Sequence, residues 1–206
     1  MDEISEIITD LRLNKQRSKF CASEYQTIIE VTGHSSIYDY ISNTEEDISV
    51  WKLQKLNQLL YQYSPFPEVS GKFRDTNNLV IMSKFETSDY SQIIPRLIEL
   101  DKTVQVLVNK SMGISRTRFI DEVVKIQHEM TVIHPFSDGN GRVTRAFLNW
   151  LFILRKLPPV YIKYGHKDKY FDALSIADQT GNFDLLSEIF YKEVLRSMIQ
   201  LNTKFN

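Results

Sequence analysis

Hydrophobic residues recur along most of the chain at intervals of three and four residues, which is the spacing of one face of an α-helix. At the start of the chain, Ile4, Ile7, Ile8 and Leu11 follow this spacing. The same pattern predicts further helices over residues 23–33, 48–63, 92–109, 117–133, 142–156, 169–179 and 184–201. The periodicity therefore predicts an all-α fold.

Two of these helices carry residues that predict where they begin or end. Ser23 followed by Gln26 resembles a capping box, so we expect a helix to open there and to stop near Gly33. Asp47 has a side chain that accepts hydrogen bonds from the first N–H groups of a helix, so we expect it to cap the helix over residues 48–63.

One segment, residues 71–83, departs from the helical pattern. The turn-forming run Asp-Thr-Asn-Asn occupies positions 75–78. The short apolar run that follows consists of Leu79, Val80, Ile81 and Met82. A turn beside such a run is typical of a strand, so the sequence predicts one small β-hairpin on an otherwise helical domain.

Composition and charge narrow the class of protein. The chain has 206 residues, enough for one domain with a sizeable core, and 42% of them are hydrophobic. Its formal net charge of −1 gives no sign of the basic surface of a nucleic-acid-binding protein. The most apolar stretch, residues 146–154, is far shorter than a membrane span. We therefore expect neither nucleic acid nor membrane as partner. Cys21 is the only cysteine, so no intrachain disulfide can form and we expect a cytoplasmic protein.

The candidate chemistry is concentrated in the run HPFSDGNGRVTR at residues 134–145. Pro135 disfavours α geometry at the residue before it, so we expect a helix to end at His134 and leave the imidazole at a sharp corner. Residues 138–141 combine two glycines with two residues that tolerate left-handed geometry. Such a turn can point successive backbone N–H groups into one concavity, which then binds anions.

The helix that begins at Arg142 adds positive charge to the same concavity, because its N-terminal N–H groups face it. Arg142 and Arg145 lie three residues apart and share one side of the first turn. Cations there oppose the helix dipole, at ~0.3–1 kcal/mol each, and an anionic ligand would explain them. The pattern indicates a polyphosphate site, with His134 as a base on one side and Asp138 as a carboxylate for a hard cation on the other.

Residues 134–145 resemble the motif of the Fic family, HxFx(D/E)GNGRxxR, at every specified position. Weaker similarities extend over roughly residues 48–200: Gly71 to Arg74, the run 79–81, His128, Ile133, Tyr170, Ala173, Leu174 and Asp178. Asn57 stands where many members carry histidine, and we interpret it as structural. The resemblance implies a Fic-fold helical bundle with a β-hairpin flap over the motif loop. It places the Fic domain at residues 47–206, after an N-terminal helical segment at 1–46.

The resemblance also implies a function, protein adenylyltransferase (AMPylator), which transfers AMP from ATP to a hydroxyl of a target protein. His134 would deprotonate a Ser, Thr or Tyr hydroxyl, and Phe136 would anchor the loop in the core. Asp138 would hold Mg²⁺ against the phosphates. The remaining motif residues would bind phosphate, namely Gly139, Asn140 and Gly141 as an anion hole, with Arg142 and Arg145 at the β- and γ-phosphates. The strand at 79–82 would pair with an extended segment of the target.

Many Fic proteins are restrained by a helix with the pattern [S/T]xxxE[G/N], whose glutamate pairs with the second arginine of the motif. Residues 24–31 resemble the N-terminal kind of this helix, with Glu30 in place but Gln26 and Val31 at the flanking positions. The alternative is an ordinary packing helix with Glu30 facing solvent. In that case restraint would come from a separate antitoxin-like partner, or would not exist. A homodimer is also compatible with the sequence.

Two other functions stay open at this point. A Fic enzyme with the same site can carry another payload, such as UMP or GMP, or can remove AMP. The intact Gly-Asn-Gly-Arg core at 139–142 favours AMP transfer over phosphorylation. A regulatory module that binds nucleotide without turnover is the third hypothesis, and the intact His134 argues against it.

Overall fold

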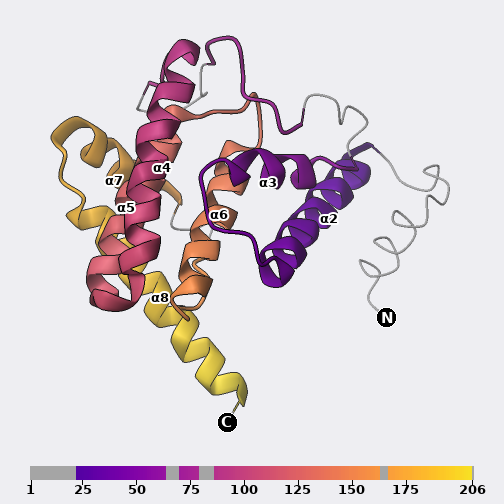
Figure 1. Cartoon of the computed structure of the whole chain (residues 1–206). Coiled ribbons are helices and arrows are strands. Elements are labelled where there is room, and N and C mark those ends of the chain that lie inside the picture. Colours follow the sequence, from indigo (N-terminus) through magenta and orange to yellow (C-terminus); the bar gives the residue numbers. More distant parts are fainter. Residues whose placement is uncertain (1–21, 64–69, 79–85, 163–166, 206) are drawn as a thin grey trace.

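A computed structural model describes residues 22–63, 70–78, 86–162 and 167–205 of the chain. Over these residues the secondary structure consists of helices and short 3₁₀ turns (Figure 1). In chain order they are α2 (Ala22–Asn43), α3 (Lys52–Leu60), η3 (Tyr90–Gln92), α4 (Ile93–Lys110), η4 (Ser111–Gly113), α5 (Arg116–Ile133), α6 (Asn140–Leu154), α7 (Lys167–Thr180) and α8 (Asp184–Phe205). The predicted all-α class is confirmed.

The predicted β-hairpin is not seen. Residues 71–78 are turns and irregular backbone without a strand. The apolar run at 79–82 lies outside the described residues, as does the first predicted helix, so both remain predictions.

The five predicted helices from residue 92 onward are confirmed, with ends that shift by up to four residues. Each of them places hydrophobic side chains at helical spacing in one core. Because that core-facing pattern is continuous in the sequence, periodicity alone was sufficient to find these helices.

The prediction that a helix stops near Gly33 is wrong. Helix α2 continues to Asn43 and buries Ile37 and Ile41 on the face that meets the rest of the bundle. A β-carbon at Gly33 would collide with the backbone carbonyl of Leu60 in α3. Gly33 therefore permits a close approach of two helices, and it does not end one.

The prediction that Asp47 caps a helix from residue 48 is also wrong. Helix α3 begins at Lys52, and its N-cap Trp51 makes no side-chain capping bond. The carboxylate of Asp101 in α4 accepts hydrogen bonds from Ser49 Oγ at 2.8 Å and from the Val50 N–H at 2.9 Å. These bonds hold the chain in a turn before the helix, so a residue 51–52 positions away replaces the predicted local cap.

Helix α6 lies at the centre of the bundle, with α2 and α3 on one side and α5 on the other (Figure 1). Most of its side chains are buried, including Phe147, Trp150 and Phe152. Its N-terminus meets the C-terminus of α5 at the loop of residues 134–139, where the predicted chemistry lies. Among the described residues, no helix has the length and apolar character to cross a membrane.

Candidate active site

His134 occupies the corner that the sequence predicts. It is the C-cap of α5, with the left-handed backbone angles φ 48° and ψ 59°, and its N–H donates to the Met130 carbonyl at 3.1 Å. Left-handed geometry is unfavourable for a histidine, so the surroundings must hold it in place. A buried arginine does so by binding the carbonyl groups at this helix end.

That buried arginine is Arg74, which is only 5% exposed. Its Nε donates to the His134 carbonyl at 2.8 Å, and its Nη2 donates to the Ile133 carbonyl at 3.3 Å and to that of Ser88. The Arg74 N–H donates in turn to the Pro135 carbonyl at 2.9 Å. A guanidinium at this point satisfies the free carbonyls of the C-terminal turn of α5 and complements the negative end of the helix dipole.

The imidazole of His134 is half-buried, with Nδ1 3.4 Å from the Thr131 carbonyl oxygen. A carbonyl can only accept, so this contact favours the tautomer with the proton on Nδ1 and leaves Nε2 with its lone pair. Burial of the ring is the main cause that lowers the pKa of His134 below its usual 6.5. A neutral imidazole with Nε2 free to accept a proton is the form that a general base requires.

The loop after His134 is held by Phe136 and Asn140. The Phe136 ring is buried, and its centre lies 5.4 Å from the centre of the Phe73 ring, in agreement with the predicted core anchor. The Asn140 side chain accepts from the Phe136 N–H at 2.8 Å and donates to the Phe136 carbonyl at 2.7 Å. Because both ends of this amide are engaged with the loop, Asn140 can contribute to an anion site through its backbone N–H.

Gly139 is the N-cap of α6, with φ 80°. A β-carbon there would lie 2.8 Å from Leu60 Cδ2 and 2.9 Å from Tyr61 Cε2, so both the backbone angle and the packing require glycine. The first hydrogen bond of α6 runs from the Val143 N–H to the Gly139 carbonyl, 2.9 Å. The N–H groups of the first turn precede this bond, and no side chain caps this end of α6. Such an end is suited to an anion.

Asp138, Tyr61 and Arg142 form one hydrogen-bonded group beside that helix end. The Tyr61 hydroxyl donates to Asp138 Oδ2 at 2.5 Å and accepts from Arg142 Nη2 at 2.8 Å. Arg142 Nη2 is also 3.3 Å from Asp138 Oδ2, and its guanidinium carbon lies 5.5 Å from the centre of the Tyr61 ring. Asp138 Oδ1 accepts the Gly139 N–H at 2.6 Å.

The Asp138 carboxylate is 76% exposed, and the described residues hold no group of three or more potential metal ligands around it. Mg²⁺ is usually bound through one or two carboxylates together with phosphate oxygens and water. Asp138 therefore fits as a ligand for an ion that arrives with a polyphosphate.

Arg145 lies one turn further along α6 than Arg142, and its guanidinium passes close to Gly141. A β-carbon on Gly141 would be 3.2 Å from Arg145 Nη1, so the glycine leaves room for this side chain. Arg145 has a large solvent-accessible surface. The protein atoms around its guanidinium nevertheless remove enough water to lower the pKa of Arg145. Both facts fit a guanidinium at the wall of a depression. The hydroxyls of Tyr38 and Tyr170 are near enough to act on its charge, and burial raises the pKa of Tyr170 to about 12, so this phenol is neutral.

Asn57 is buried and joins two parts of the site, in agreement with the structural interpretation. Its Nδ2 donates to the Asp138 carbonyl at 3.1 Å, and its Oδ1 accepts the Gly71 N–H at 2.7 Å. Sequence reasoning missed Tyr61 and gave Arg74 no role. The available signal for Tyr61 was its position four residues after Asn57, on the same face of α3.

The motif residues His134, Asp138, Gly139, Arg142 and Arg145 are thus brought around one helix end. Two predicted groups cannot be placed there. Glu30 lies within α2, but its side chain is outside what the structure describes, and so are residues 79–82.

Comparisons with known proteins agree with this geometry. A model of the Fic/DOC family matches residues 47–152, just over half of the chain. The chain is 44% identical over 52 residues to "Protein adenylyltransferase Fic" of Aedes aegypti and 25% identical over 157 residues to the protein of that name from Nematostella vectensis. These matches cover 25% and 72% of this chain, but 10% and 34% of the relatives. The chain therefore spans about a third or less of their length.

Solved structures show the same fold. Fic-1 (residues 134–508) from C. elegans is similar with a TM-score of 0.70 at 17% identity, over 97% of this chain and 58% of that chain. A Fic domain from Bartonella quintana with bound ADP gives 0.71 at 17%, covering 86% and 87%. BepC from Bartonella tribocorum with bound AMPPNP gives 0.67 at 19%, covering 84% and 87%. Together with the match of the family model, the fold and the motif loop show that this chain belongs to the Fic/DOC family.

Proposed function

We propose that the protein is an adenylyltransferase that moves AMP from ATP to a Ser, Thr or Tyr hydroxyl of a target protein. One observation carries the proposal: a half-buried histidine with a lowered pKa lies in the same short loop as a helix N-terminus that has two arginines and no capping side chain. The names of the curated relatives and the AMPPNP and ADP bound to solved Fic domains support the same reaction.

The reaction follows from the roles that these groups can take. His134 Nε2 accepts the proton of the acceptor hydroxyl while its oxygen forms a bond to the α-phosphorus of ATP. The bond from that phosphorus to the bridging oxygen of the β-phosphate breaks, and pyrophosphate leaves with the electron pair. General-base help of this kind contributes about 10²–10⁴-fold.

The first turn of α6 binds the phosphates. Its N–H groups stabilise negative charge at the α-phosphate, and Arg142 and Arg145 bind the β- and γ-phosphates. Tyr61 holds the Arg142 guanidinium and the Asp138 carboxylate in one arrangement before the nucleotide binds. A Mg²⁺ ion held by Asp138 would neutralise phosphate charge.

The target and any inhibitor are part of the proposal as well. The run at 79–82 would align an extended segment of the target, and Glu30 would restrain the enzyme by pairing with Arg145. In Glu30→Gly the arginine would be released, so AMP transfer should rise, most visibly as automodification. Equal automodification by wild type and variant would leave α2 as a packing helix, and restraint would then come from a separate antitoxin-like partner or not exist. The single cysteine fits a cytoplasmic setting for the reaction.

The function is tested with labelled ATP. The protein is incubated with Mg²⁺, cell lysate and ATP labelled at either the α- or the γ-phosphate, with His134→Ala as the matched control. Adenylyl transfer predicts protein label from α-labelled ATP alone, lost in the control. Label from γ-labelled ATP would show phosphorylation. Absence of label with intact nucleotide binding would exclude AMP transfer and leave a different payload, AMP removal or a binding module.

A further inference from the structure

The end of helix α3 contacts both helix α2 and the motif loop. Helix α3 packs against α2 and against α6 (Figure 1). Leu60 is its last residue, and Tyr61 and Gln62 follow it. These three residues are called the α3 end below. The α3 end therefore connects α2, which carries no residue of the motif, to the place where the motif residues lie.

The contact between the α3 end and α2 is made by backbone atoms and leaves no free space. A β-carbon at Gly33 would lie 2.1 Å from the Leu60 carbonyl oxygen and 2.8 Å from its carbon, which is closer than such atoms can approach. About one turn further along α2, Ser36 Oγ accepts a hydrogen bond from Gln62 Nε2. The position of α2 therefore determines the position of the α3 end.

The contact between the α3 end and the motif loop is equally close. A β-carbon at Gly139 would lie 2.8 Å from Leu60 Cδ2 and 2.9 Å from Tyr61 Cε2. The Tyr61 hydroxyl donates to the Asp138 carboxylate and accepts from the Arg142 guanidinium. Because Gly139 is the N-cap of α6, the α3 end touches the helix N-terminus and the two charged groups beside it.

We propose that α2 positions the phosphate site through the α3 end, with Gly33 and Ser36 as positioning residues. A displacement of α2 moves the α3 end, because neither of the two close contacts leaves a gap that could absorb the displacement. Tyr61 then no longer holds Asp138 and Arg142 in the arrangement that suits a polyphosphate and its metal ion. The packing of α2 thus supports the binding of ATP.

This role of α2 is separate from the proposed restraint by Glu30. Restraint requires a direct pair between Glu30 and Arg145, and its loss raises AMP transfer. Loss of the packing contact has the opposite sign, because it weakens ATP binding. The inference rests on the phosphate site of the proposed function, but it concerns binding alone and does not depend on the transfer step.

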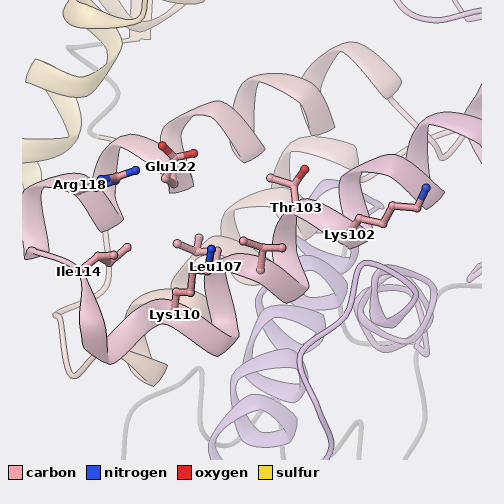
Figure 2. Close-up of a pocket in the computed structure, with 8 residues that line it drawn as sticks. Lys102, Thr103, Leu107, Lys110, Ile114, Arg118 and Glu122 are labelled. Atoms are coloured by element: carbon pink, nitrogen blue, oxygen red, sulfur yellow. The ribbon is translucent and has the colours of Figure 1, made fainter.

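The main test adds one methyl group at Gly33. In Gly33→Ala the new carbon forces α2 away from the Leu60 carbonyl, so ATP with Mg²⁺ should bind the full chain about tenfold more weakly by calorimetry. Gly113→Ala is the matched control. Gly113 precedes Ile114, which lines the groove between α4 and α5 (Figure 2), and a β-carbon at Gly113 meets no atom within 4 Å, so we expect unchanged affinity. Ile41→Val, a buried substitution on α2, controls for a loss of stability without the collision.

A double-mutant cycle tests the route through Tyr61. Tyr61→Leu already removes the hydroxyl and the ring, so adding Gly33→Ala to it should weaken ATP binding by less than about twofold. A general disturbance of the fold would weaken binding by the same factor in both backgrounds. Such an equal loss would overturn the proposal.

Hydrogen exchange measures the same coupling without nucleotide. Amides of residues 134–145 should exchange faster in Gly33→Ala than in the wild type, and at an unchanged rate in Gly113→Ala. This measurement separates the inference from the proposed function. Faster exchange and weaker ATP binding in a protein that transfers no AMP would contradict the proposed function alone.

Ser36→Ala provides a second test if Gly33→Ala does not fold. It removes the hydrogen-bond acceptor of Gln62 without adding bulk, so ATP affinity should fall about two- to threefold. Unchanged ATP affinity in a folded Gly33→Ala variant would overturn the proposal. Where Gly33→Ala does not fold, unchanged affinity in Ser36→Ala would overturn it.

Discussion

Two helix ends meet at the motif loop, and they differ in whether protein side chains bind their unpaired backbone groups. The C-terminus of α5 is closed by protein groups, because Arg74 binds its carbonyls and is itself buried. The N-terminus of α6 lacks a capping side chain and is flanked by arginines whose charge opposes its dipole. The difference indicates that one end serves to fix His134, whereas the other is kept for a ligand that carries negative charge.

Replacing His134, which the closed C-terminus of α5 holds in place, should have the largest effect. His134→Ala should reduce AMP transfer by about 10²–10⁴-fold and leave ATP affinity nearly unchanged, because the base contacts the acceptor and not the phosphates. Transfer is followed with α-labelled ATP, and binding is measured by calorimetry. A parallel loss of ATP binding, with the fold intact by circular dichroism, would assign His134 a structural role.

Opening the closed end should destabilise the protein. Arg74→Met keeps the bulk of the side chain but leaves buried carbonyls of Ser88, Ile133 and His134 without this donor, so the free energy of unfolding should fall by about 2–4 kcal/mol. Urea unfolding measures the change. Arg116→Met is the matched control on the exposed first turn of α5, where we expect a change within about 0.5 kcal/mol. Equal stability of the two variants would contradict the role of Arg74 at this helix end.

The open end, the N-terminus of α6, is tested through Arg145, which the proposal assigns to the γ-phosphate. Arg145→Ala should weaken ATP by ~1.5–3 kcal/mol, the range of a hydrogen bond to a charged group, and should weaken ADP far less. Calorimetry with both nucleotides gives the comparison. If ATP and ADP lose the same affinity, Arg145 does not contact the γ-phosphate.

The two ends also differ in how far the sequence predicts them. The open end depends on local backbone chemistry, so Gly139, Gly141 and the arginine spacing were sufficient to place a helix N-terminus that can bind an anion. Pro135 likewise placed the corner at His134. The closed end depends on Arg74, which is 60 residues from His134 in the chain, and no local pattern connects them.

The same limit explains the two wrong helix boundaries. Glycine commonly ends helices, but Gly33 lies inside α2, where it leaves room for the close approach of Leu60. Asp47 is a good capping residue, but Asp101 holds the preceding turn from another helix. The residues that signal a helix end act locally, and a contact with a distant part of the chain can override them. A wide apolar face is different, because it exists in order to pack against the rest of the protein, so it predicts the helix and its packing together.

The smallest effect should come from Tyr61, which touches the open end from α3. Tyr61→Phe removes the hydroxyl between Asp138 and Arg142 but keeps the ring that packs against Gly139 and under the guanidinium. Asp138 and Arg142 can still contact each other directly at 3.3 Å. The substitution therefore weakens the fixed arrangement of these two groups but removes no charge. We expect ATP binding to weaken by about 0.5–1.5 kcal/mol, the net contribution of one hydrogen bond, with little change in unfolding free energy. Tyr61→Leu should also lose the ring contacts and weaken binding further. If Tyr61→Phe binds ATP as tightly as the wild type while Tyr61→Leu does not, the ring alone positions Arg142 and the hydroxyl has no part in it.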